Sequence, residues 1–237
     1  MDQSSFANNQ TIQASSTPIA AQAASWVSAE EHKSVLEKMI NTLKQPVGSL
    51  PREQSLYLEQ QISDLLGFEV ASELDQIHLP HTFGILAALP HLRRHPQDQI
   101  TDHPTMQEAG LAPHRSSFGW FTEMGQLTQL AIEREKYFVS IQVDLLPEWR
   151  TSAQKLTEWY KYRKVVVINP VHELAVVACV GDFGPGNWIQ HQFGASPEIV
   201  RHLGAWDLES QGKMFVFLVN DPTNKIALGP VKMGINL

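Results

Sequence analysis

The C-terminal segment Val165–Val219 constrains the fold more strongly than any other part of this chain. The apolar run Leu174–Val180 leads directly into a Gly-Asp-x-Gly-Pro turn at Gly181–Pro185, and a second strand-like run, Lys213–Val219, closes the segment. Between these runs, Ser196–Leu203 has the N-cap serine, the first-position proline and the following glycine of a short helix. Short apolar strands that alternate with turns and one helix predict a small closed β-barrel.

Other parts of the C-terminal half add to this pattern. A strand is predicted at Tyr137–Val143, where apolar positions alternate, and a buried strand at Val165–Ile168. Helical turns are predicted at Thr128–Lys136 and at Ala153–Tyr160.

The N-terminal part of the chain predicts a helical hairpin. Residues 1–25 are rich in Ser, Ala, Gln, Asn and Thr without an apolar period, which is typical of a disordered tail. Ser28 and Glu31 form a capping-box signature for a first helix. A second helix is predicted to start at Pro51 and to stop at Gly67. Two short helices bury little surface alone, so we expect the hairpin to cover another part of the protein.

Two further segments complete the predicted organisation. Thr82–Leu92 predicts a third helix, and the polar, histidine- and proline-rich stretch His91–Pro113 predicts a long loop or linker. The chain is therefore expected to comprise a disordered tail at 1–25, a helical region with its loop at 26–113, and a barrel domain at 114–237.

Composition excludes several classes of protein. The net charge of -7 and the scattered basic residues argue against a nucleic-acid partner. Cys179 is the only cysteine, so no internal disulfide is expected, and its apolar surroundings predict a buried thiol. No apolar run is long enough for a membrane span. The N-terminus lacks the pattern of a signal peptide, so the chain is either cytoplasmic or exported by a route that this sequence does not show.

Three motifs follow one another in the C-terminal half. Ser116–Thr122 combines serines, aromatic residues and a glycine; Val180–Pro185 is a strand that ends in Gly-Asp-x-Gly-Pro; Gly194–Gly204 leads through a helix to Leu-Gly. In this order and spacing the region Ser116–Val219, about half the chain, resembles double-psi β-barrel proteins of the rare lipoprotein A and expansin group. The resemblance implies a six-stranded double-psi-like β-barrel. Together with the N-terminal helical hairpin predicted above, it gives an α+β fold.

The same resemblance implies a protein that binds or cleaves a cell-wall polysaccharide such as peptidoglycan, in the cell envelope or outside the cell. Asp182 matches one acidic residue of the family and is the candidate general acid/base, as in a lytic transglycosylase or glycosidase. Its structural alternative is a turn aspartate whose carboxylate accepts backbone N–H bonds. The family's other acidic residue falls on Gly194, which cannot carry a proton, so binding without cleavage is an open alternative.

A second acid is sought among the nearby carboxylates because glycan cleavage often uses two. Glu123 is preferred because it follows the aromatic segment Phe118–Phe121, which borders a groove in the family. A solvated loop charge is the alternative for Glu123. Other acidic residues in the region are Asp144, Glu173 and Glu198.

Aromatic residues are the candidate contacts to a sugar. Trp188 follows a glycine-rich turn, where a large apolar residue is unusual unless it is covered or used. Trp120 and Phe118 are further stacking candidates, and His191 is a candidate hydrogen-bonding partner for the glycan or for Asp182. Packing in the core is the alternative for each aromatic residue.

No metal site and no cofactor are expected. The pairs His78/His81 and His91/His95 have suitable spacing, but no pair forms a complete ligand signature with cysteines or acidic residues.

The alternative to a glycan-directed function is a non-catalytic scaffold that binds a protein partner through helices 28–66. An exposed apolar face on Val35, Met39 and Leu43 would favour that alternative.

Overall fold

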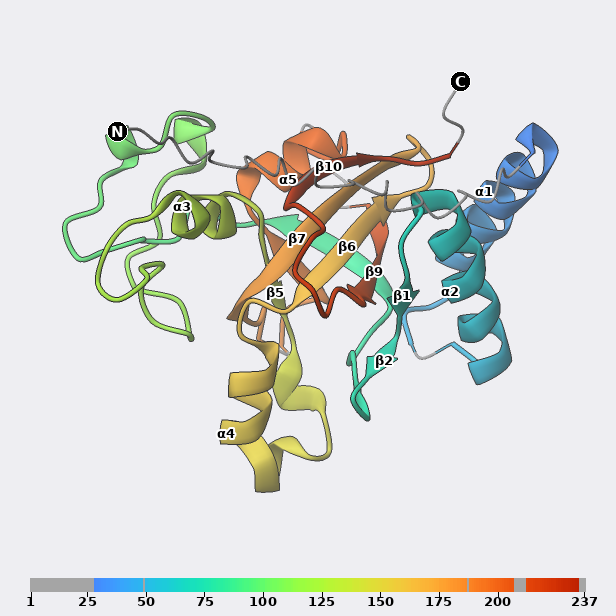
Figure 1. Cartoon of the computed structure of the whole chain (residues 1–237), viewed down its shortest axis with the longest axis horizontal. Helices are drawn as coiled ribbons and strands as arrows, with labels where there is room; N and C mark the ends of the chain where they lie inside the picture. The colour runs from blue at the N-terminus through green and yellow to red at the C-terminus, as the bar shows by residue number, and fades with distance from the viewer. Residues whose placement is uncertain (1–27, 49, 187, 207–211, 235–237) are drawn as a thin grey trace, which may run out of the picture.

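The computed structural model describes residues 28–48, 50–186, 188–206 and 212–234, and its centre is a closed six-stranded β-barrel (Figure 1). The tail predicted at 1–25 lies outside the described residues. The six barrel strands are β4 (Phe83–Ala88), β5 (Phe138–Ile141), β6 (Lys164–Asn169), β7 (Leu174–Phe183), β8 (Phe193–Ala195) and β9 (Lys213–Val219). Around the ring β4 pairs with β8, then β5, β7, β6 and β9 follow, and β9 pairs with β4 again.

Strand direction differs around this ring. The pairs β4/β8 and β5/β7 are parallel, and the other pairs are antiparallel. Two short strands extend the sheet outside the ring: β1 (Val70–Ala71) pairs with β9, and β10 (Gly229–Lys232) pairs with β7. The strands β2 (Glu73–Leu74) and β3 (Ile77–His78) form a separate hairpin.

Strand β6 shows why the sequence is apolar on both faces of the barrel wall. Val165 and Val167 belong to the interior core, whereas Val166 and Ile168 belong to a second core outside the barrel. Successive side chains of a strand point to opposite faces, so an apolar run without alternation requires cover on both. The outer cover consists of helices α1 (Ala29–Leu43) and α2 (Arg52–Leu66) (Figure 1).

The helical hairpin is confirmed, together with the signals that delimit it. Ser28 and Glu31 form both hydrogen bonds of the capping box, and Gly67 ends α2 in the left-handed conformation with φ 74°. The expectation that the hairpin covers another surface is also confirmed. Val35 and Met39 are buried in the second core, so the apolar face that a protein partner would need is occupied by the barrel.

The helix predicted at Thr82–Leu92 is wrong, because this segment contains strand β4. The run is too short for periodicity to separate a buried strand from a helix, and pairing with β8 and β9 decides its conformation. Gly84 supports that pairing, since a β-carbon there would lie 2.7 Å from Cβ of Gln192. The barrel therefore draws strands from both sides of residue 113.

The remaining elements surround the barrel. The helices are α3 (Gln129–Lys136), α4 (Trp149–Tyr160) and α5 (Pro197–His202), and the 3-10 turns are η1 (Ile100–Asp102), η2 (Gln107–Ala109) and η3 (Val143–Leu145). Residues 91–136, called the side lobe below, lie beside the barrel on the side away from α1 and α2, while α4 extends below the barrel (Figure 1). Across the described ranges, the helices are all too short or too polar to cross a membrane.

Candidate functional site

Asp182 lies at the end of β7 and is half-buried. Its Oδ1 accepts hydrogen bonds from the backbone N–H of Ser117, at 2.7 Å, and of Phe183, at 2.9 Å. This oxygen therefore ties the segment around residue 117 to the end of the barrel. The geometry is that of the turn aspartate set out above as the structural alternative to catalysis.

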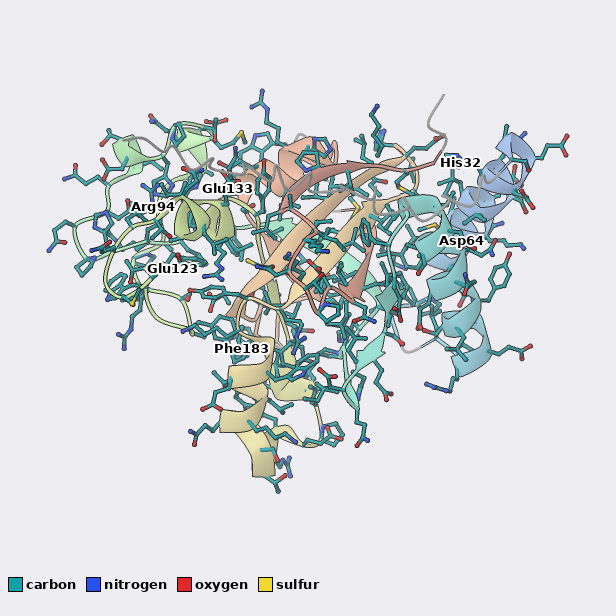
Figure 2. All side chains as sticks on the ribbon, viewed as in Figure 1. His32, Asp64, Arg94, Glu123, Glu133 and Phe183 are labelled. Atoms are coloured by element: carbon teal, nitrogen blue, oxygen red, sulfur yellow. The ribbon has the colours of Figure 1, made fainter. Side chains whose placement is uncertain are left out.

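Aromatic side chains pack around this end of the barrel. The ring of Phe183, labelled above α4 in Figure 2, meets Phe118 edge-on at 4.7 Å and Trp149 at 5.5 Å between centroids. Phe118 is buried, and it also contacts Tyr162 at 6.2 Å. Its position gives it a packing role, and its predicted contact with a sugar stays a prediction. Trp120 lies nearby in sequence and is half-buried.

The loop between β7 and β8 carries the most exposed of the predicted site residues. Trp188 is 85 % exposed, and Ile189 beside it is also exposed. The loop stems are held by Gln142, a buried side chain whose Nε2 donates to the carbonyls of Pro185 at 3.0 Å and His191 at 3.3 Å. Gln142 thus holds both stems of the loop, and the side chain of Trp188 between them is exposed to solvent. His191 is half-buried.

Sequence reasoning missed Gln142. The available signal was an amide residue between Ile141 and Val143, directly after strand β5, where a buried polar side chain needs partners.

Gly194, the position at which the resemblance would place an acidic residue, lies in β8. A β-carbon added there would lie 2.4 Å from Cδ1 of Leu89. The space that a carboxylate side chain would enter is therefore filled by Leu89.

Glu123 lies in the side lobe, where Figure 2 labels it, and both of its carboxylate oxygens have partners there. Its Oε1 lies 3.1 Å from the Arg134 guanidinium, and its Oε2 accepts from the Thr128 hydroxyl at 2.6 Å. Arg134 also stacks on Tyr162, with 4.3 Å between the guanidinium carbon and the ring centroid. These contacts give Glu123 a structural function in the hairpin that precedes α3.

A buried network of charged groups in the side lobe was not anticipated. Its five members, each at most 3 % exposed, are Arg94, Asp98, His103, Glu135 and His91. Glu135 Oε1 lies 3.2 Å from Nδ1 of His91, and Glu135 Oε2 lies 3.3 Å from Nδ1 of His103. Asp98 Oδ2 lies 3.1 Å from Nε2 of His103, and Asp98 Oδ1 accepts from Arg94 at 2.8 Å.

The groups in this network shift one another's ionisation. Burial opposes the charge of Glu135, but hydrogen bonds from His103 and His91 outweigh it and lower the pKa of the Glu135 carboxyl. Burial likewise opposes the charge of Asp98, but Arg94 outweighs it and lowers the pKa of that carboxyl. For His91, burial is outweighed by Glu135, and the imidazole pKa is raised.

No short motif could have indicated this network, because Glu135 lies 44 residues beyond His91. The available signal was the length of the segment 91–113, which is unusual for a connection without internal structure.

A groove of about 640 Å³ lies between the side lobe and α5. Thr105, Met106 and Lys136 line one part of it, and Glu198 and Arg201 line another. Thr105 donates its hydroxyl hydrogen to Glu198 Oε1 at 2.6 Å. The groove contains none of the preferred predicted site residues.

Comparisons of the chain with protein-family models, with curated proteins and with solved structures found no match. The contacts described above are therefore the basis for assigning a function.

Proposed function

We propose that this chain binds a peptidoglycan-like polysaccharide of the cell wall and does not cleave it. The observation that carries the proposal is the exposure of Trp188, at 85 %, in a loop whose stems are fixed by Gln142. An indole face in solvent offers apolar contact to the C–H face of a pyranose, and the hydrogen bonds of Gln142 hold the loop stems on either side of Trp188.

The fold proposed for this function is a double-psi β-barrel. The closed ring supports it, because the pairs β4/β8 and β5/β7 are parallel in a barrel that is otherwise antiparallel. Parallel neighbours require connections that cross over the barrel. The hairpin of α1 and α2 then serves as cover for the outer wall. A cell-wall ligand would place the protein in the cell envelope.

Three observations favour binding over cleavage. Oδ1 of Asp182 accepts two backbone hydrogen bonds, and Glu123 is paired with Arg134. At Gly194, the space for an acidic side chain is filled by Leu89. Trp120 and His191 are proposed as flanking contacts to the glycan.

Co-sedimentation with insoluble peptidoglycan tests the binding proposal. We expect the wild-type chain to be retained and Trp188→Ala to bind about tenfold more weakly, equivalent to about 1.4 kcal/mol. Leu56→Ala is the matched control, since Leu56 is also an exposed apolar residue but lies on α2. Equal retention of wild type and Trp188→Ala would contradict the proposal.

Incubation of peptidoglycan with the wild-type chain and with Asp182→Asn tests the absence of cleavage. We expect no soluble muropeptides from either protein. Muropeptide release by the wild type that is abolished in Asp182→Asn would instead establish the lytic activity.

A further inference from the structure

The buried network of the side lobe contains three side chains whose donor atoms converge. One donor atom from each of His91, His103 and Glu135 lies within 4.8 Å of the other two. We propose that these residues bind one divalent transition-metal ion such as Zn²⁺. The site shares no residue with the glycan-binding loop proposed above, so it stands independently of that function.

The spacing of the donors fits an ion. Nδ1 of His91 and Nδ1 of His103 lie 3.2 Å and 3.3 Å from the two oxygens of Glu135. Ligands at about 2.0–2.1 Å from a tetrahedral Zn²⁺ lie about 3.3 Å apart. Hydrogen bonds between an imidazolium and a carboxylate are normally shorter, at about 2.7–2.9 Å. Because the two distances run to different oxygens, an ion shared by both rings would be bound by both oxygens of Glu135 or by one after a small rotation of the carboxylate; the three donor atoms lie within 4.8 Å of one another.

The outer nitrogens of both rings already have partners. Nε2 of His91 lies 3.0 Å from the carbonyl oxygen of Thr105, and Nε2 of His103 lies 3.1 Å from Asp98. Asp98 is held in turn by Arg94. Histidines that bind a metal through one nitrogen commonly donate the other N–H to a carbonyl or a carboxylate. With Nε2–H as the donor of each neutral ring, both Nδ1 lone pairs would be free to bind an ion beside Glu135 in place of the hydrogen bonds that the rings otherwise donate to it.

An ion would also satisfy the polar groups that face the two rings. Without a metal, all four ring nitrogens face acceptors, so full hydrogen bonding requires two buried imidazolium rings with centroids 4.2 Å apart. The carboxylates of Glu135 and Asp98 would offset part of the repulsion between two such rings. One divalent ion can replace the two Nδ1 protons without changing the total charge. Each histidine then stays neutral and keeps one N–H for its outer acceptor.

The three ligands are buried, and with three protein ligands a tetrahedral Zn²⁺ would keep its fourth position for a water molecule. All three ligands are at most 2 % exposed, and they join the start of the side lobe to helix α3. An ion at this point would link the long segment 91–113 to the helix that follows it. The nitrogen and oxygen donor set favours Zn²⁺ or Co²⁺ over Mg²⁺ or Ca²⁺, which prefer oxygen ligands.

The test uses the full chain after chelator treatment and dialysis, titrated with ZnCl₂. The histidine side chains are followed by long-range ¹H–¹⁵N correlation spectra, which distinguish ring nitrogens bound to a metal from those bound to hydrogen. We expect saturation at one equivalent and metal-bound Nδ1 signals for two of the ten histidines, His91 and His103. Calorimetry in buffers of different ionisation enthalpy should show proton release, up to two per ion.

Variants provide the matched comparison. Glu135→Gln and His103→Gln should weaken Zn²⁺ binding at least 100-fold, by an order-of-magnitude estimate. His114→Gln should bind as the wild type does, because His114 is an exposed histidine of the same lobe. MgCl₂ should produce no saturable response.

Several results would overturn the proposal: no saturable binding of Zn²⁺ by the wild type at micromolar concentration, Zn²⁺ signals on other histidines, or wild-type affinity in Glu135→Gln. If the ligand variants fail to fold, the ring spectra of the wild type decide alone.

Discussion

Leu89 lies against the backbone of Gly194 so closely that a β-carbon at position 194 would stand 2.4 Å from its Cδ1 and 2.7 Å from its Cγ. Gly194 is held in place from both sides, since it pairs with Ala87 of β4 and with Ser140 of β5. The backbone therefore cannot move away from Leu89 without disturbing the barrel. In this packing, there is no room for a side chain at position 194.

Replacement of Gly194 by alanine should consequently lower the free energy of unfolding by about 1–3 kcal/mol through overpacking. In a Leu89→Ala background the same replacement should have a smaller effect, because the colliding atoms are gone. Urea denaturation of the two single variants and the double variant measures this coupling. Gly48→Ala is the control, since a β-carbon there meets nothing within 4 Å. Additive effects of the two replacements would contradict a clash between Leu89 and a side chain at position 194.

The two roles considered for Asp182 predict different variant series. If the carboxylate pins Ser117 and Phe183, Asp182→Ala should destabilise the fold by about 1–2 kcal/mol, since two backbone donors lose their acceptor. Asp182→Asn should retain much of that stability, because its amide oxygen accepts the same bonds. Thermal and urea denaturation of both variants measure the difference. Equal stability of wild type and Asp182→Ala would contradict the pinning role.

Elements with local signals were predictable from the sequence. The caps at Ser28 and Ser196, and the left-handed stop at Gly67, are set by residues within one turn of the helix end. The strands β6 and β7 were expected from uninterrupted apolar runs. The predicted buried thiol of Cys179 is confirmed for the same reason.

Features that depend on distant partners were not predictable in the same way. Strand β4 is fixed by pairing with β8 and β9, which lie more than a hundred residues later in the chain. Glu135 contacts His91 only because α3 lies against the first residues of the side lobe, and the 44-residue separation of the two residues in the sequence does not indicate that contact. That position 194 has no room for an acidic side chain could be seen only once the position of Leu89 was known.

Asp221 should make the stability of the fold depend on acid. Burial alone would raise the pKa of its carboxyl, but the Lys164 ammonium and the N–H groups of Lys225 and Ile226 outweigh this effect and lower the pKa. A lowered folded-state pKa stabilises the fold above the unfolded value of about 3.9, and the stabilisation is lost as pH falls through the folded value.

Asp221→Asn should therefore be less stable than wild type at pH 7, by about 1–2 kcal/mol from the loss of charge-assisted hydrogen bonds. The difference should shrink below about pH 4, where the carboxyl of the unfolded chain begins to take up a proton, and should be lost as pH falls through the lower folded-state pKa. Urea denaturation at pH 7, 5 and 3 measures it, with the exposed Asp144→Asn as control. A difference that stays constant down to pH 3 would contradict the role of the charge.

The thiol of Cys179 should report global opening of the barrel. It lies on β7 with 1 % of its surface exposed, and burial raises its pKa to about 12. The thiolate is the reactive form, so we expect almost no labelling of the native protein by an aromatic disulfide reagent at pH 8. In urea the single cysteine should label completely, at a rate that follows unfolding measured by circular dichroism. Rapid labelling of the native chain would show that β7 opens locally, contrary to its pairing with β5, β6 and β10.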